Sequence, residues 1–337
     1  MGKKTNGVGR LFGGIDVGGT KILAMVADEN GNVLSTAKKK TKGEQGFKAV
    51  CERAAVTMLE AAEVEGLTLG DLTAIGVGVP TPVLPDGVAA YAPNLPGWKN
   101  APLIKNMEAF TARPCYGVND GNAGVYGEYV FGAGKGAKTL LGLFVGTGIG
   151  GGVCYHGELI VGENHMAAEM GHIIVQEGGR KCGCGHLGCL EAYASKTGMA
   201  RKIAWEIIQE GRESILAEMV PNGNYATIKS SALQEAYRKE DPVAVEALRE
   251  LAHYLGVGVA SYITLLGPDM VVIGGGVFES LGKELMPFVK ESARRRTWPE
   301  ASYKDTKIIL AQLGDHAVGL GAAAHAKHRF AAETKTS

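Results

Sequence analysis

The feature that most limits how this chain can fold is a plan of strand, glycine turn and strand that occurs twice. In the first copy, two apolar runs are separated by Gly18, Gly19 and Thr20, and a second turn leads to a third extended run. In the second copy, apolar runs flank a loop of glycines that begins at Gly146. The expected strands are residues 11–17, 21–27, 33–39, 139–145, 153–155 and 159–161. Two such meanders, each followed by helices, predict a duplicated α/β architecture with a cleft between the halves.

Other segments complete this plan. Apolar residues recur at helical spacing in 44–65, and the short apolar run 74–79 predicts a buried strand. Residues 270–273 are expected to form a strand that runs into three glycines, with a helix after them to about residue 290. A further strand should end near Val118, directly before a helix.

Composition excludes several classes of function. Apolar residues make up 45% of the 337 residues and charged residues 21%, with zero formal net charge, so no strong attraction to nucleic acid is indicated. The fifty glycines are about twice the usual ~7% share, and their clustering at strand ends suggests backbone-lined loops around a ligand. No signal peptide is evident, and glycines and polar residues interrupt the apolar stretch 251–266. We therefore expect a cytoplasmic protein that binds neither membranes nor nucleic acid.

The first glycine turn, Asp16-Val-Gly-Gly-Thr-Lys21, places an acid at the end of a strand. Glycines let backbone N–H groups approach phosphate oxygens closely, and a carboxylate at such a place can hold Mg²⁺ through water. The alternative is a plain hairpin turn in which Asp16 is a local cap.

The second glycine turn fits the G-x-G-x-x-G pattern through Gly146, Gly148 and Gly151, with Thr147 between the first two. A dinucleotide fold would need a long helix directly after these glycines, but residues 153–155 look extended, which argues against it. Residues 132–139 resemble a P-loop, but Ala137 stands where a glycine is required, so we expect an ordinary loop.

Three cysteines, Cys182, Cys184 and Cys189, lie within eight residues among glycines. In a chain without a secretion signal, this spacing is typical of a metal site more than of disulfides. His172 could complete a tetrahedral His-Cys₃ zinc site of the structural kind, and His186 is a rival fourth ligand. The alternative is three buried thiols without a metal.

Polar residues mark candidate substrate contacts. Asp120 stands where a helix is expected to begin, so it is either a helix N-cap or a general base, with Asn119 orienting a substrate hydroxyl. Glu169 and Glu191 flank the cysteine cluster and could bind a polyhydroxylated ligand. Asn94 and Trp98 lie in a proline-stiffened loop that either faces a sugar or is an ordinary surface loop.

Together these segments resemble the ROK family, whose name covers repressors, open reading frames and kinases, and residues 93–98 look most like its glucokinase branch. The segments run in the family's order and span most of the chain. They are Asp16-Val-Gly-Gly-Thr-Lys21, Asn119-Asp120, Val145-Gly-Thr-Gly-Ile-Gly-Gly-Gly152, Glu169-Met-Gly-His172, Cys182-Gly-Cys-Gly-His-Leu-Gly-Cys-Leu-Glu191 and Gly274-Gly-Gly276.

The resemblance implies an actin-like, hexokinase-type (ribonuclease H-like) fold of two lobes that close over substrate. The small lobe would be residues 1–118, completed by 315–337, and the large lobe 119–314. The resemblance implies an ATP:hexose 6-phosphotransferase with Mg²⁺ and structural Zn²⁺, in which Asp120 is the catalytic base. Sugar contacts would be Asn94, Asn119, Asp120, Glu169, His172 and Glu191. Phosphates would lie on Asp16, Gly18, Gly19, Thr20, Lys21, Gly146, Thr147, Gly148 and Gly151, with Gly274, Gly275 and Gly276 nearer the adenosine. The zinc ligands would be His172, Cys182, Cys184 and Cys189.

Glucose is the expected substrate, and N-acetylmannosamine, mannose, fructose or allose are alternatives. Polyphosphate is an alternative phosphoryl donor, and a homodimer or tetramer is the expected assembly. The family also contains sugar-binding transcriptional regulators, but only fifteen residues precede Asp16, so no helix-turn-helix is expected. Thr81, His165 and Ala168 stand at or near positions where the family usually has glycine, which makes the choice of sugar the least determined property.

Overall fold

The structure is a computed structural model and describes residues 9–92 and 95–336. The described chain forms two compact units. The first lies within residues 1–136, 152–168 and 315–337, and the second is residues 137–151 and 169–314. The first unit thus includes residues 119–136 and 152–168, which we expected in the second lobe.

A five-stranded sheet forms the centre of the first unit, in the order β3-β2-β1-β4-β7. Its strands are β1 (Leu11–Val17), β2 (Lys21–Asp28), β3 (Val33–Lys40), β4 (Leu72–Val79) and β7 (Cys115–Asn119). Strands β1, β4 and β7 are parallel, and Gly78 of β4 lies beside both Asp16 and Val118. Because the carboxyl ends of parallel strands meet at one edge of a sheet, this register brings the ends of β1 and β7 together.

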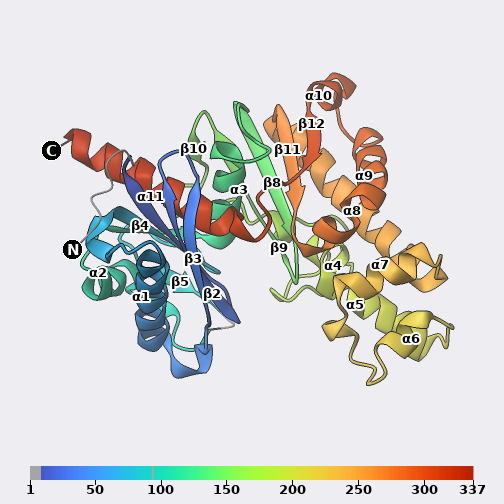
Figure 1. The fold of residues 1–337 in the computed structure, drawn as a ribbon. Helices are drawn as coiled ribbons and strands as arrows, with labels where there is room; N and C mark the ends of the chain where they lie inside the picture. The colour runs from blue at the N-terminus through green and yellow to red at the C-terminus, as the bar shows by residue number, and fades with distance from the viewer. Residues whose placement is uncertain (1–8, 93–94, 337) are drawn as a thin grey trace. The chain divides into compact units, whose positions relative to one another are not determined.

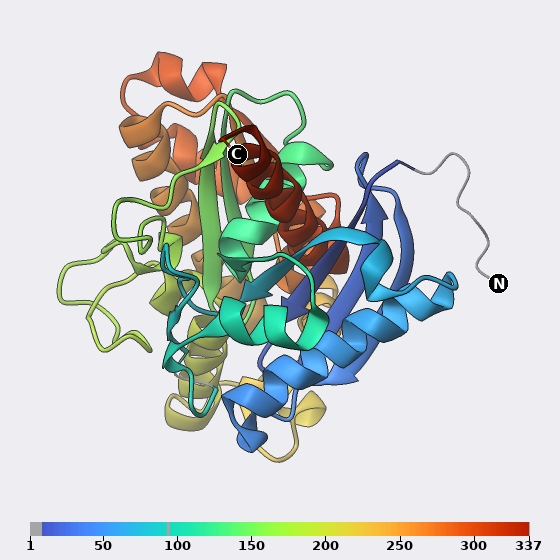
Figure 2. The ribbon, with the colours of Figure 1, turned by 90° about the vertical axis from the view of Figure 1, so that its left-hand side faces the viewer.

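Helices cover both faces of this sheet, as can be followed in Figures 1 and 2, where α1 (Phe47–Val64) is blue and α11 (Ala317–Thr336) is red. Neighbouring glycines of β1 face different helices, since a β-carbon at Gly13 would meet Met58 of α1 and one at Gly14 would meet the Gly319 carbonyl of α11. The unit also contains α2 (Leu103–Thr111), α3 (Asp120–Val130) and the hairpin of β5 (Ala89–Tyr91) and β6 (Lys99–Ala101).

Helix α11 packs at backbone distance because glycines line its contacts. A β-carbon at Gly321 would lie 1.6 Å from the Ala123 carbonyl oxygen of α3, and one at Gly76 of β4 would lie 1.8 Å from the Ala322 carbonyl oxygen. Side chains at these positions are therefore sterically excluded. This close packing fixes α11 against both the sheet and the helix that begins with Asp120.

The second sheet has the order β10-β9-β8-β11-β12. Its strands are β8 (Thr139–Val145), β9 (Ile149–Tyr155), β10 (Glu158–Leu159), β11 (Met270–Gly274) and β12 (Lys307–Leu310), and the chain passes from one unit to the other within β9. The helices of the second unit are α4 (Glu191–Ala194), α5 (Lys196–Ala204), α6 (Ile215–Met219), α7 (Ser230–Arg238), α8 (Pro242–Leu266), α9 (Gly276–Arg294) and α10 (Glu300–Asp305). Over the described residues, no helix combines the length and apolarity needed to span a membrane.

Most expected elements are confirmed, including both meanders and the strand at 270–273. Two expectations were wrong. The glycine loop expected at 146–152 ends at Gly148, and β9 begins at Ile149, because Gly151 packs inside the sheet where a β-carbon would lie 2.4 Å from the Gly142 carbonyl oxygen. The strand expected at 159–161 is the short pair Glu158–Leu159.

Candidate active site

The turn between β1 and β2 holds the first group of candidate phosphate contacts. Gly18 N–H donates to the Lys21 carbonyl at 2.9 Å and closes the turn, while a β-carbon at Gly19 would meet no atom within 4 Å. Thr20 is exposed, and Lys21 Nζ pairs with Asp315 Oδ2 at 3.2 Å. An open backbone face beside a lysine is suited to phosphate oxygens.

Asp16 ends β1 directly before this turn. Burial raises the pKa of its carboxyl to about 7, with Asp120 and Asp315 adding to the rise and Lys21 opposing it. Asp16 and Asp120 oppose each other's ionisation at the ends of parallel strands. A cation bound there would reduce this repulsion. Asp315 lies in the 3₁₀ turn Gly314–His316, two residues before α11, and the sequence analysis missed it because nothing in its local pattern marks it.

Asn119 and Asp120 lie where β7 passes into α3. Asn119 Oδ1 accepts a hydrogen bond from Asn122 N–H at 3.1 Å, so Asn119 is the N-cap and Asp120 is the first helical residue. The interpretation of Asp120 as the cap is therefore wrong. The Asp120 carboxylate is half-buried, and its Oδ1 accepts from the Gly121 N–H at 2.7 Å. It remains suited to accept a proton from a substrate hydroxyl.

In the second unit, hydrogen bonds from the start of α5 hold the loop Gly146-Thr147-Gly148. Lys196 N–H donates to the Gly146 carbonyl at 2.9 Å, and the Thr197 hydroxyl donates to the Thr147 carbonyl at 2.7 Å. A β-carbon at Gly148 would lie 2.3 Å from Glu191 Oε2, so only glycine permits the approach of this carboxylate. Thr147 itself is exposed.

A third glycine turn joins β11 to α9. Gly275 has φ 86°, which is a left-handed conformation, and a β-carbon there would lie 2.5 Å from the Val145 carbonyl oxygen. Gly274 ends the buried strand and Gly276 begins α9, whose N-cap position has no side-chain hydrogen bond. The first N–H groups of a helix lack intrahelical acceptors, so this helix start is a place where a polar ligand can be bound.

The cysteine cluster brings four possible metal ligands close together. The ligand atoms of His172, Cys182, Cys184 and Cys189 all lie within 4.8 Å of one another. Cys184 Sγ and Cys189 Sγ are 3.7 Å apart, and Cys182 Sγ is 3.7 Å from His172 Nδ1. Two ligands of a tetrahedral zinc at ~2.0–2.3 Å are expected about 3.6–3.8 Å apart. The donor set therefore fits zinc.

His186 is placed beside this cluster without completing it. Its Nδ1 lies 3.5 Å from Cys184 Sγ, but it is not one of the four residues whose donor atoms are mutually close. A metal held by His172 and three cysteines has four protein ligands and no open position, which is the form of a structural site.

Glu191 links the cysteine cluster to the glycine loop. Its Oε1 accepts from Cys182 Sγ at 3.4 Å, and its Oε2 accepts from Ile149 N–H at 2.9 Å. Glu169 interacts electrostatically with Glu191 and His172. Loss of hydration raises the pKa of its carboxyl, His172 opposes the rise and Glu191 adds to it. The two acids and His172 therefore form one group in the second unit, as expected from the sequence.

The loop Pro93–Trp98 is described only in part. Asn94 lies outside the described residues, so its contact with a sugar stays a prediction. Trp98 is 1% exposed and packs edge-on against Phe47 with ring centroids 5.0 Å apart. The interpretation that Trp98 faces a sugar is wrong, because the ring belongs to the core of the first unit.

The structure shows the backbone conformations and contacts of His165, Ala168 and Thr81, which stand at or near positions where the family usually has glycine. His165 and Ala168 have φ 55° and 64°, the left-handed conformation that favours glycine. His165 Nδ1 lies 3.1 Å from the Val83 carbonyl oxygen, which ties this loop to the segment after β4. The Thr81 hydroxyl, which is buried, bonds the Tyr91 backbone at 2.8 and 2.9 Å.

Known proteins resemble this chain over nearly its whole length. Residues 12–329 match the ROK family. The chain is 33% identical over 321 residues to a glucokinase of Thermotoga maritima, covering 94% of this chain and 97% of that protein. It is 36% identical over 314 residues to a glucokinase of Streptomyces coelicolor, covering 92% and 95%.

A solved ROK family glucokinase from Streptomyces griseus, in complex with glucose and AMPPNP, is 34% identical and superposes with a TM-score of 0.80 over 94% of this chain and 99% of that one. The expected actin-like fold of the hexokinase type is thereby confirmed. The chain belongs to the ROK family.

Proposed function

We propose that this protein is a ROK hexose kinase that transfers the γ-phosphoryl group of ATP to the 6-hydroxyl of glucose. The observation that carries the proposal is the match to glucokinases over at least 92% of both chains. The structure with glucose and AMPPNP belongs to a relative at 34% identity, which supports glucose and an adenine nucleotide as the substrates.

Asp120 is proposed as the general base. The sugar O6 attacks the γ-phosphorus, the bond from that phosphorus to the β,γ-bridging oxygen breaks, and the hydroxyl proton passes to the Asp120 carboxylate as ADP leaves. Asn119 is proposed to orient the sugar. Its Oδ1 is used in capping α3, so its side-chain amide nitrogen supplies the donors to a hydroxyl.

Charge neutralisation is proposed to come from three glycine turns and a metal. Mg²⁺ bound with ATP would neutralise the phosphates, and Asp16, with its raised pKa, is the carboxylate suited to face it. Backbone N–H groups of residues 18–21 and 146–148 would contact phosphate oxygens, and residues 274–276 would lie nearer the adenosine.

The cysteine cluster is proposed to hold a structural zinc ion. It would fix His172, whose second ring nitrogen can face a sugar hydroxyl, and Glu191, which contacts Cys182. Glu169, His172 and Glu191 are therefore proposed as sugar contacts that depend on the metal. Asn94 completes the proposed set.

Mannose, fructose, allose and N-acetylmannosamine remain alternative sugars, because Thr81, His165 and Ala168 differ from the family pattern. A transcriptional regulator receives less support, because the glucokinases named above match over 95–97% of their own length. A cytoplasmic location and a homodimer or tetramer are further parts of the proposal.

The test is a donor and sugar panel with the purified protein. ADP release is followed by a coupled assay for each sugar with ATP, and product formation is followed separately with polyphosphate. We expect the highest kcat/KM for glucose with ATP. A protein that binds glucose but forms no sugar phosphate with ATP or with polyphosphate would be a binding protein, and the proposal would be wrong.

A further inference from the structure

A cavity of about 490 Å³ is lined only by residues of the first unit. None of the three glycine turns described above contributes to its lining. Its walls are the edge strand β7, the start of α3, the C-terminal half of α11 and the segments 83–87 and 157–165. This volume is in the range of small-molecule sites. Among the candidate site residues only Asn119 reaches it.

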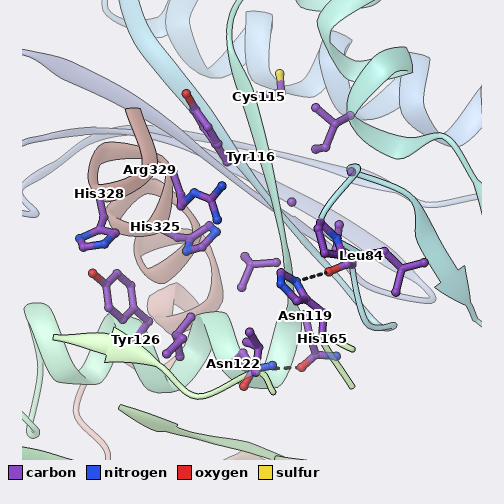
Figure 3. A pocket seen from close by; sticks show the side chains of 18 of the residues that line it. Leu84, Cys115, Tyr116, Asn119, Asn122, Tyr126, His165, His325, His328 and Arg329 are labelled. Carbon is purple, nitrogen blue, oxygen red and sulfur yellow. Dashed lines mark hydrogen bonds between the residues drawn. The ribbon is translucent and has the colours of Figure 1, made fainter. Parts of the chain in front are cut away.

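Helix α11 presents one basic face to this cavity. His325, His328 and Arg329 follow the i, i+3, i+4 spacing that places side chains on the same side of a helix. Figure 3 shows His325 and Arg329 beside each other, with Tyr126 of α3 near His328. Lys327 points elsewhere, since its Nζ donates to the Glu29 carbonyl at 2.8 Å.

The carboxylates around the cavity already have donors. Glu158 Oε1 pairs with His328 Nε2 at 3.1 Å, and Glu333 Oε2 accepts from the Tyr116 hydroxyl at 2.7 Å. Glu108 Oε1 accepts from Cys115 N–H at 3.2 Å. A ligand that offers donors would therefore compete with bonds that exist in the protein.

Three side chains at the cavity carry donors without hydrogen-bond partners, and the buried Asn122 Oδ1, an acceptor, also lacks a partner among the described residues. Within the described residues, neither Arg329 nor His325 makes a hydrogen bond or an ion pair, and the hydroxyl of the buried Tyr126 makes no hydrogen bond. Burial, together with the nearby Arg329, His328 and His165, lowers the pKa of His325 to about 3. The ring is therefore neutral, and its N–H can donate to an anion beside the Arg329 charge.

We propose that this cavity binds a small phosphorylated metabolite, with its phosphate on Arg329, His325 and Tyr126. Arginine and imidazole N–H groups form charge-assisted hydrogen bonds with phosphate oxygens. The cavity is larger than a phosphate group, and the unpartnered Asn122 Oδ1 can accept a hydrogen bond from a ligand hydroxyl, which suits a phosphate ester that carries hydroxyls. None of the residues proposed to contact the phosphates of ATP lines this cavity.

Ribose 5-phosphate is a suitable probe, because it is not a product of the proposed reaction, and ribose is its uncharged match. Binding is measured by calorimetry with glucose and AMPPNP present in excess, so that the proposed active site is filled. We expect one equivalent of ribose 5-phosphate to bind and ribose not to bind. In Arg329→Gln, which removes an exposed charge, affinity should fall at least about tenfold, the effect of losing one strong charge-assisted contact.

Lys327→Gln is the matched control, because it removes the same charge from the same helix on a side that faces Glu29. It should bind the probe like the unaltered protein. No binding of ribose 5-phosphate at millimolar concentration would overturn the proposal, and so would equal affinities in Arg329→Gln and Lys327→Gln. Both outcomes are independent of whether the protein phosphorylates glucose.

Discussion

Asn119 caps α3 through its side-chain oxygen, 3.1 Å from the Asn122 amide nitrogen, and so the next residue, Asp120, begins the helix. An aspartate that caps a helix uses its carboxylate to satisfy backbone donors two or three residues on. In this protein the neighbouring asparagine performs that role. The Asp120 carboxylate is therefore not the helix cap, and it lies at the carboxyl end of β7, as the first residue of α3.

Asp16→Asn should raise the free energy of unfolding at neutral pH and weaken the affinity for Mg-ATP. Burial and Asp120 raise the pKa of Asp16 to about 7, above the ~3.9 of an unfolded chain. The native protein thus binds more protons than the unfolded chain between about pH 4 and 7, so this group's contribution to stability falls as pH rises through that window.

The gain from Asp16→Asn is therefore expected to be small near pH 4 and largest above pH 7, at most a few kcal/mol. Urea unfolding at about pH 4.5 and about pH 8 measures the difference in the free energy of unfolding between the variant and the unaltered protein. Asp305→Asn, a change at an exposed site in the second unit, is the control and should change little at either pH. A variant less stable than the unaltered protein at pH 8 would contradict the account.

Cys184→Ser should lose most of the proposed zinc and weaken glucose binding about tenfold or more, because the metal would fix His172 and the contact between Cys182 and Glu191. Metal content by atomic absorption and glucose affinity by calorimetry check the two parts. A zinc-free protein that binds glucose normally would show that the metal does not support the sugar contacts.

The two histidines near the cluster give a sharper comparison. His172→Asn should lose zinc, since His172 supplies one of four mutually close donors, whereas His186→Asn should retain one zinc ion per chain. Retention in His172→Asn together with loss in His186→Asn would reverse the assignment of the fourth ligand.

Gly321→Ala should destabilise the first unit by a few kcal/mol, because the added β-carbon would lie 1.6 Å from the Ala123 carbonyl oxygen and α11 would have to move. Gly276→Ala is the matched control, a helical glycine whose β-carbon would meet nothing closer than 4.0 Å. It should be neutral or slightly stabilising. Equal unfolding midpoints for both variants in urea would contradict the packing described for α11.

Local pattern was sufficient for much of this fold. Strand boundaries at 11–17 and 139–145 follow from apolar runs that end at glycine turns, and the structure has the same boundaries. The error at Gly151 has a clear cause. A glycine required for close strand packing and a glycine required by a loop look alike in a sequence, and only the nearby Gly142 carbonyl distinguishes them.

The candidate site shows the same limit. His172 and the three cysteines could be grouped because ligand spacing is encoded along the chain. Asp315 and the basic face of α11 could not, because they meet their partners only through the packing of a C-terminal helix against strands some three hundred residues earlier in the chain. Trp98 was misjudged because a buried ring and a ligand-facing ring give the same sequence signal.

The most direct test of the central claim is the rate of glucose 6-phosphate formation by Asp120→Asn at saturating glucose and ATP. Loss of the proton acceptor should lower kcat by at least ~10², while glucose affinity stays close to that of the unaltered protein. Turnover near the unaltered rate in a folded, glucose-binding Asp120→Asn protein would contradict the assignment of Asp120 as the base.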